Sequence, residues 1–332
     1  MDRAGLVMIK GMDAVQKLGG MAPAQSMLGH QVASEKIRPD GRPTSEWRTE
    51  LRKIPGLRNL LTLVLLYGQT IGIIWIAIAL HNPIVYVVVF LLMGRSHAQY
   101  ASLMHEAAHR LLFANKAVND FVGRWLLGYP SFVNTDGYRF VHMAHHREEF
   151  GPNEPDIPLY ANYPITRDSF RRKLVRDITG VTGIRLMRDQ FAGLFQRHSR
   201  SRNTQLKIIA VQVLIFAILA VSGHPWIYFG LWLLPFLTVW RTINRLRSIA
   251  EHGGLRADTD RRITTHSVRQ SLITRFMIVP YNIGWHLAHH VDSGIPFRSL
   301  PRYHAELRRI GYVTAEYEYP SYRAIWRSLQ AG

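Results

Sequence analysis

Histidines gather in three short motifs of this 332-residue chain, at spacings that bring imidazoles together on a helix. The motifs are HEAAH at 105–109, HMAHH at 142–146 and HLAHH at 286–290, and a further histidine, His252, stands in the segment AEHG. Residues three or four positions apart lie on one face of an α-helix, so each motif directs its imidazoles toward one spot. The two adjacent histidines that end each HxxHH motif diverge by about 100°, which suits ligands that reach two neighbouring ions.

These motifs predict a metal centre with at least two ions. Imidazole nitrogens bind iron, zinc, copper and nickel, and the motifs offer more of them than one tetrahedral zinc ion can use. The chain has no cysteine, which excludes a thiolate zinc site, an iron–sulfur cluster and a catalytic thiol. Neutral nitrogen ligands leave a metal pair more positive and more oxidising, which is the property needed to attack an unactivated C–H bond with oxygen.

Two long uncharged windows indicate the elements that position the motifs. Residues 59–94 and 208–240 contain no Asp, Glu, Lys or Arg. One membrane span needs about 20 apolar residues, so each window holds two spans joined by a turn, HNP at 81–83 and SGHP at 222–225. We therefore predict an all-α membrane protein in which two transmembrane hairpins carry a cytoplasmic helical cap with the metal site. The four predicted spans are about 58–80, 84–104, 206–222 and 226–244.

Charge predicts the orientation of these spans. The chain carries 41 Lys and Arg against 23 Asp and Glu, a net charge of +18, and neither short turn has a Lys or Arg. The positive-inside rule then places both termini and the histidine motifs in the cytoplasm, and we expect a bacterial cytoplasmic membrane with its lipids as surroundings. We expect no nucleic-acid partner, because no basic stripe carries a reader motif. The predicted membrane domain is 58–310, between cytoplasmic tails at 1–57 and 311–332.

The three motifs, in this order around two hairpins, resemble the histidine boxes of the integral-membrane fatty acid desaturase family. The resemblance runs over about 58–310 and includes PFRSLPRYH at 296–304 and RSIAEH at 247–252. It implies two non-haem iron ions, O2 as co-substrate, a fatty acyl chain that gains a double bond, and an external electron carrier such as ferredoxin with its reductase, since no haem-binding HPGG motif is present. The ligands that it implies are His105, His109, His142, His145, His146, His252, His286, His289 and His290.

Other polar side chains near the motifs are candidates for orienting the imidazoles through their ring N–H groups. They are Glu106, Asp156, Glu251, Asn282 and His97. A helix cap is an equal alternative for Asn282, and His97 also suits a polar residue that caps or snorkels near a span end. Relatives with an Asn four positions before the additional histidine have a counterpart here in Ser248, which makes a water-mediated metal contact there doubtful.

Three alternatives stay open at this point. HEAAH is also an H-E-x-x-H zinc-protease motif with Glu106 as general base, although that reading leaves both HxxHH motifs unexplained. A membrane metal transporter would need ionisable residues inside its spans, which hold almost none. Within the same superfamily, a hydroxylase, alkane monooxygenase, carotenoid ketolase or decarboxylase would start from the same oxidant, and small distances near the metals would decide the outcome.

Overall fold

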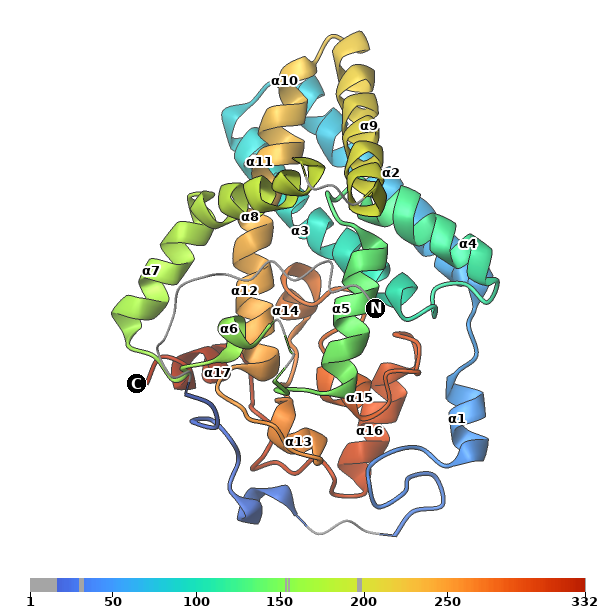
Figure 1. The fold of residues 1–332 in the computed structure, drawn as a ribbon, viewed down its shortest axis with the longest axis vertical. Coiled ribbons are helices and arrows are strands. Elements are labelled where there is room, and N and C mark those ends of the chain that lie inside the picture. Colours follow the sequence, from blue (N-terminus) through green and yellow to red (C-terminus); the bar gives the residue numbers. More distant parts are fainter. Residues whose placement is uncertain (1–16, 30–32, 153, 155, 196–198, 332) are drawn as a thin grey trace.

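All regular elements of the described chain are helices. The computed structural model describes residues 17–29, 33–152, 154, 156–195 and 199–331, and within these ranges extended residues pair only in two isolated bridges. Four helices are long and apolar enough to cross a membrane, which confirms the predicted spans and fold class: Gly56–Leu80, Pro83–Ala108, Ser201–Val221 and Pro225–His252. The spans gather at one end of the molecule and the shorter helices at the other (Figure 1).

The first hairpin consists of α2 (Gly56–Leu80) and α3 (Pro83–Ala108). His81 ends α2 in the left-handed region, with φ of 44°. The side chain of Asn82 then caps α3 by accepting from the amides of Ile84 and Val85 at 2.9 and 3.4 Å. Pro83 suits the first helical position because its missing N–H has no partner there in any helix. This local chemistry explains why two spans fit into one uncharged window.

The second hairpin pairs α9 (Ser199–Val221) with a fourth span that is interrupted. Pro235 lacks a backbone N–H, and Thr238 leaves the helical region with φ of −121° and ψ of −80°. A proline inside a helix removes a hydrogen bond and favours such a break. The pieces of the fourth span are α10 (Pro225–Ile227), the π-helical η4 (Tyr228–Leu233), α11 (Leu234–Leu237) and α12 (Val239–His252).

The second and fourth spans extend further than their predicted bounds. The second was predicted to end at 104 and α3 ends at Ala108; the fourth was predicted to end at 244 and α12 ends at His252. Both helices continue into the cap, where protein rather than lipid surrounds them, so loss of apolar character does not mark their ends. Each continuation carries histidines of the predicted site.

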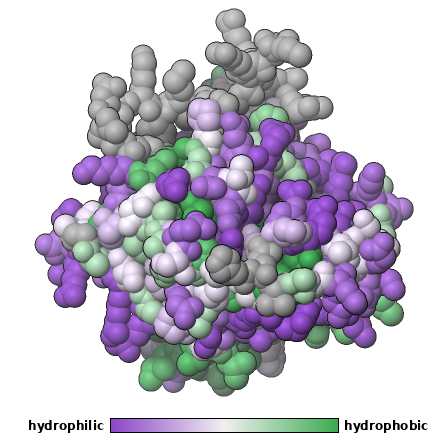
Figure 2. All heavy atoms as spheres, turned by 90° about the horizontal axis from the view of Figure 1, so that it is seen from below, coloured by the Kyte–Doolittle hydropathy of each residue, from purple (hydrophilic) through white to green (hydrophobic). Residues whose placement is uncertain are grey.

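Short helices build the cap. Its face away from the spans is largely hydrophilic, as expected for a surface in water (Figure 2). The helices are η1 (Gln25–Leu28), α1 (Ser45–Leu51), α4 (Lys116–Phe121), η2 (Val122–Gly128), α5 (Thr135–Arg147), α6 (Ile157–Tyr160), α7 (Arg167–Ile178), α8 (Val181–Ala192), η3 (Gly193–Phe195), α13 (Arg261–Thr264), α14 (Leu272–Met277), α15 (His286–Val291), α16 (Leu300–Arg309) and α17 (Tyr322–Ser328).

The described parts of both predicted tails pack into the cap. Trp47 and Leu51 of α1 are buried, as are Ile325 and Leu329 at the other end of the chain. Residues 1–16 of the predicted N-terminal tail lie outside the described residues. The domain boundaries at 57 and 310 remain predictions.

Candidate metal centre

Four elements from distant parts of the chain meet beneath the spans. The last turn of α3 carries the first motif, α5 the second and the six-residue α15 the third, and α12 ends at His252. On α5, the side chain of Asn134 accepts from the amide of Gly137 at 3.1 Å and so starts the helix two turns before its histidines. The helical spacing of each motif thus aims its imidazoles into one buried space.

Five imidazoles form a first cluster, with one ring nitrogen of each within 4.8 Å of the others. Its members are His105, His109, His142, His146 and His289. The Nε2 atoms of His109 and His142 are 2.9 Å apart, and the Nε2 atom of His146 lies 3.0 Å from those of His142 and His289. The first motif and parts of the other two therefore share one centre.

The remaining four imidazoles of the predicted set form a second cluster. Ring nitrogens of His145, His252 and His290 lie within 4.8 Å of one another. His286 joins them, since its Nε2 atom lies 3.0 Å from those of His252 and His290. The two adjacent histidines of each HxxHH motif thus lie in different clusters.

Hydrogen-bond acceptors hold the outer nitrogens of the second cluster. In three of its four imidazoles the Nδ1–H donates away from the cluster centre, which leaves the lone pair of Nε2 facing inward. The pairs are His145 with Glu154 Oε1, His290 with Glu149 Oε1 at 2.5 Å, and His252 with the carbonyl oxygen of Thr264 at 2.8 Å. Arg261 in turn lies 2.6 Å from Glu149 Oε1.

Sequence reasoning missed Glu149 and Glu154. Both follow the second motif closely, in the segment 147–154, and acidic residues so near an HxxHH motif are the signal that was available. The segment is irregular after Arg147, where α5 ends. Because such a segment has no periodicity, only the folded chain shows which way its carboxylates point.

The clusters satisfy a simple test for a bound cation. His286 Nε2 faces the Nε2 lone pairs of both His252 and His290, and a single N–H can serve only one of them. Both ring nitrogens of His105 are buried without a hydrogen-bond partner among the described residues. A buried polar group left unpaired costs about 1–3 kcal/mol. A metal ion at each centre would accept these lone pairs, so the residues fit the predicted ions.

The nitrogen separations also discriminate between coordination geometries. With metal–nitrogen bonds of about 2.1 Å, two ligands at a right angle lie about 3.0 Å apart, and two at the tetrahedral angle about 3.4 Å. The Nε2 separations in the structure are 2.9–3.0 Å. They are close to the separation of two ligands at a right angle and shorter than that of two ligands in a tetrahedral zinc site.

Burial keeps most of these imidazoles neutral, which is the form that binds a metal. It lowers the pKa of His109 to about 3 and holds the pKa of His142 and His146 well below the ordinary value. The histidines of the third motif behave in the same way. Burial acts on His145 in the same direction, but the hydrogen bond and charge of Glu154 outweigh it and raise the pKa of His145.

Among the predicted orienting residues, Glu251 lies close to an imidazole of the second cluster. Its Oε1 atom is 3.5 Å from His286 Nδ1 and 3.0 Å from Arg247 Nε. Among the described residues the carboxylate of Asp156 hydrogen-bonds no imidazole. Burial raises the pKa of Asp156, and the charge of His145 lowers it by less. Glu251 therefore stays a candidate for orienting His286.

The other three predicted orienting residues have partners elsewhere. Glu106 Oε1 accepts from the amide of Phe297 at 3.0 Å. Asn282 accepts from Arg275 at 3.1 Å and donates to the carbonyl oxygen of Phe297 at 3.2 Å, and it caps no helix. His97 Nε2 lies 3.0 Å from the carbonyl oxygen of Trp232. In the structure these three side chains are hydrogen-bonded to groups outside the two clusters, so it does not bring them to the imidazoles that they were predicted to orient.

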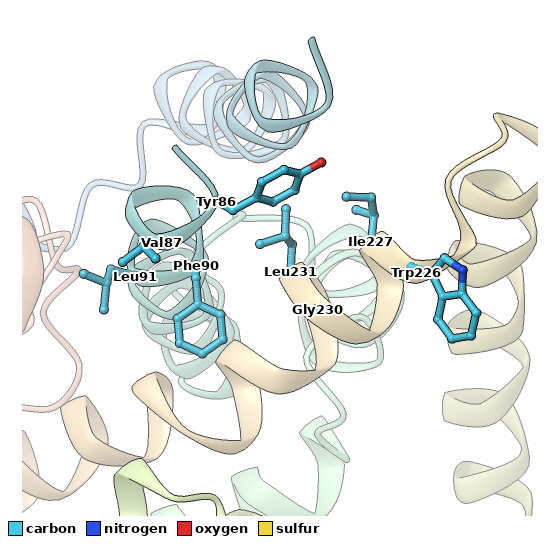
Figure 3. Close-up of a pocket in the computed structure, with 8 residues that line it drawn as sticks. All are labelled: Tyr86, Val87, Phe90, Leu91, Trp226, Ile227, Gly230 and Leu231. Atoms are coloured by element: carbon cyan, nitrogen blue, oxygen red, sulfur yellow. The ribbon is translucent and has the colours of Figure 1, made fainter. Parts of the chain in front are cut away.

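An apolar groove of about 750 Å³ lies between α3 and the start of the fourth span (Figure 3). Its lining runs from Tyr86 to Leu91 on α3 and from Trp226 to Leu231 opposite. Leu91, the lining residue nearest to the first motif, precedes His105 by 14 positions, which is about 21 Å along a helix. The groove is thus remote from the clusters. A group bound in it would lie too far from the metal positions to react there.

Comparisons with known proteins agree with the geometry. A family model described as fatty acid desaturase matches residues 81–326. The dihydrorhizobitoxine desaturase of Bradyrhizobium elkanii is 25% identical over 228 residues, which cover 64% of this chain and 64% of that relative, less than two thirds of its length. The sn-1 oleoyl-lipid 12-desaturase of Arthrospira platensis is 23% identical over 278 residues, which cover 77% of each chain. With four apolar spans, a buried histidine cluster and a family match over most of its length, the chain belongs to the fatty acid desaturase family.

Proposed function

We propose that this chain is a membrane-bound di-iron oxidoreductase that uses O2 and two electrons to introduce a double bond into a fatty acyl chain. The observation that carries the proposal is the meeting of nine imidazoles in two adjacent buried clusters. In this assignment the first cluster holds one iron ion and His145, His252, His286 and His290 hold the other. Bound iron would supply the oxidising power that breaks unactivated C–H bonds.

The fold excludes water from the proposed site and keeps most of its imidazole ligands neutral. The imidazoles other than His109 are buried. The ring of Tyr138 stacks on that of His142 with centroids 5.0 Å apart and planes at 16°, and so covers one side of the first cluster. Water kept away from an oxidising metal pair cannot compete with the acyl chain for reaction.

The proposed reaction balances with O2 as the only oxidant. Two neighbouring methylenes, –CH2–CH2–, lose two hydrogens and two electrons and become –CH=CH–. An external carrier supplies two further electrons, and two protons come from the medium. O2 takes up all four electrons and leaves as two molecules of water.

The family supports an acyl lipid substrate, and the two relatives are named for different ones, dihydrorhizobitoxine and an oleoyl lipid. We propose an acyl lipid or acyl thioester in the cytoplasmic leaflet, with cap and termini in the cytoplasm as the positive-inside rule requires. The +18 charge favours an acidic electron carrier such as ferredoxin. Turnover with such a carrier should then fall as salt rises.

The zinc-protease alternative finds no support at its proposed base. Oε1 of Glu106 accepts the backbone N–H of Phe297 at 3.0 Å, so this oxygen is engaged by the protein rather than free to activate water. A single tetrahedral ion would also leave the second cluster without a function.

The decisive test is expression in a lipid-producing host, followed by mass spectrometry of total lipids and metal analysis of the purified protein. The proposal expects a new double bond and two iron ions per chain. New hydroxyl or keto groups would assign the chain to a hydroxylase or ketolase instead. One zinc per chain and unchanged lipids would contradict the proposal altogether.

A further inference from the structure

The two clusters differ in what surrounds them. Carboxylates back the second cluster: Glu154 accepts from His145 and Glu149 from His290, while Glu251 lies 3.5 Å from His286 Nδ1. In the first cluster no carboxylate of the described residues hydrogen-bonds an imidazole. The Nδ1 atoms of its His105 and His146 are buried without a hydrogen-bond partner in that part of the chain, whereas in the second cluster this holds for the Nδ1 atom of His286 alone.

A carboxylate on the outer nitrogen changes what an imidazole offers to a metal. It fixes the tautomer so that the Nε2 lone pair faces inward, holds the ring orientation and makes the ring a stronger donor. Removing such a partner typically lowers metal affinity 10–100-fold. The side chains of Glu149 and Glu154 are 0% exposed, so water cannot take over their role.

Charge separates Glu154 from the other two glutamates. Glu149 lies 2.6 Å from Arg261 and Glu251 lies 3.0 Å from Arg247, so a guanidinium offsets the charge of each. Among the described residues Glu154 forms an ion pair only with His145, and its other oxygen accepts from the amide of Phe150. No guanidinium of the described residues offsets the charge of Glu154, so its carboxylate favours a cation at the second cluster.

Resting on the proposed di-iron function, we propose that the two metal positions are inequivalent and that Glu154 is the positioning residue that sets metal affinity at the second. Its carboxylate holds His145 as a strong, correctly oriented donor. The ion at the second position therefore has more electron density from its ligands than the ion among the five imidazoles of the first cluster. Loss of the carboxylate weakens the second position alone.

The test compares the wild type with Glu154→Gln, each purified at full length from cells grown on ⁵⁷Fe. The iron content per chain is measured at increasing chelator concentration, and Mössbauer spectra are recorded before and after chelation. For the wild type we expect two quadrupole doublets of equal area. For Glu154→Gln we expect a 10–100-fold lower chelator concentration to remove one iron per chain, with the loss of one doublet and retention of the other.

Glu106→Gln is the matched control, because Glu106 is also buried but accepts from the amide of Phe297 rather than from an imidazole. We expect it to leave both doublets and the chelator resistance unchanged. The retained doublet in Glu154→Gln shows that the variant has folded.

The outcomes separate this inference from the proposed function. Wild-type protein without iron would contradict the proposed function itself. Two irons in one indistinguishable doublet, two irons retained at wild-type chelator resistance in Glu154→Gln, or simultaneous loss of both irons in that variant would each overturn the inference and leave the di-iron centre standing.

Discussion

The four spans fall into two kinds: two have a mean hydropathy of 2.1 in their most apolar stretch, and two have 1.2. In the outer spans, α2 and α9, only 22% and 17% of the most apolar stretch is buried, against 50% in each of the inner spans, α3 and Pro225–His252. Both inner spans continue into the cap and end at histidines of the candidate centre, and neither outer span carries one. Lower hydropathy and deeper burial therefore go together in the two spans that carry the candidate centre.

Close packing explains why the inner spans can hold a fixed geometry. A Cβ atom at Gly94 of α3 would lie 2.3 Å from Cβ of Val239 on α12, so only glycine permits this approach. His97 on α3 lies 3.0 Å from the carbonyl oxygen of Trp232 on the fourth span, beside the ring of Phe236. Two helices joined in this way hold His105 and His252 at set positions relative to each other.

The largest expected effect concerns the candidate metal centre, where the two inner spans end. His289→Ala and His145→Ala each remove one proposed ligand, from the first and the second cluster respectively, and we expect product to fall to background with iron lost from the purified protein. Each variant should still insert into the membrane, because the altered side chain lies in the cap. His224→Ala, in the turn at the far end of the second hairpin, is the control that should keep activity. Undiminished turnover in both variants would remove them from the site.

A smaller effect is expected where an inner span is tied to the cap. The buried carboxylate of Asp177 on α7 pairs with Arg245 on α12. Asp177→Ala leaves this guanidinium uncompensated and should cost about 3–5 kcal/mol of stability. The exposed pair of Arg188 and Asp189 on α8 provides the control, since Asp189→Ala should cost at most about 1 kcal/mol. Thermal unfolding in detergent compares them, and equal losses would contradict the distinction.

Overpacking the inner pair should have the next effect. Gly94→Leu forces a side chain into Val239 and should cost about 1–3 kcal/mol. Gly68→Leu on α2 should be neutral, because a Cβ atom there has nothing within 4 Å. Val239→Ala should restore part of the loss when combined with Gly94→Leu. Melting curves of the purified variants would tell them apart, and a larger loss for Gly68→Leu would reverse the assignment of inner and outer spans.

The smallest effect is expected on the lipid-facing side of an outer span. Ile71 on α2 is 64% exposed, and Ile71→Ala should change stability by less than about 0.5 kcal/mol. Leu66 on the same helix is 1% exposed, and Leu66→Ala should cost about 2–5 kcal/mol through lost packing. If Ile71→Ala proved as costly, another molecule would have to cover this face of α2.

The sequence by itself determined the features that depend on neighbouring residues. Two uncharged windows sufficed for four spans, because burial in lipid is set by local composition. Helical spacing within HEAAH and the two HxxHH motifs sufficed to recognise the family, which the match over 81–326 confirms. Pro235 is a local signal for an interrupted helix, but the uniformly apolar residues around it do not show that the interruption falls at Thr238.

Only the tertiary structure decided how the imidazoles are shared. Helical geometry predicts that His145 and His146 diverge, but the relative placement of α5 and α15 sets His146 beside His289 and His145 beside His290. The same holds for the carboxylates: Glu154 reaches an imidazole from an irregular segment, whereas Glu106, within the first motif, binds the amide of Phe297. Contacts between segments distant in the chain depend on how whole helices pack, and no spacing along one helix contains that information.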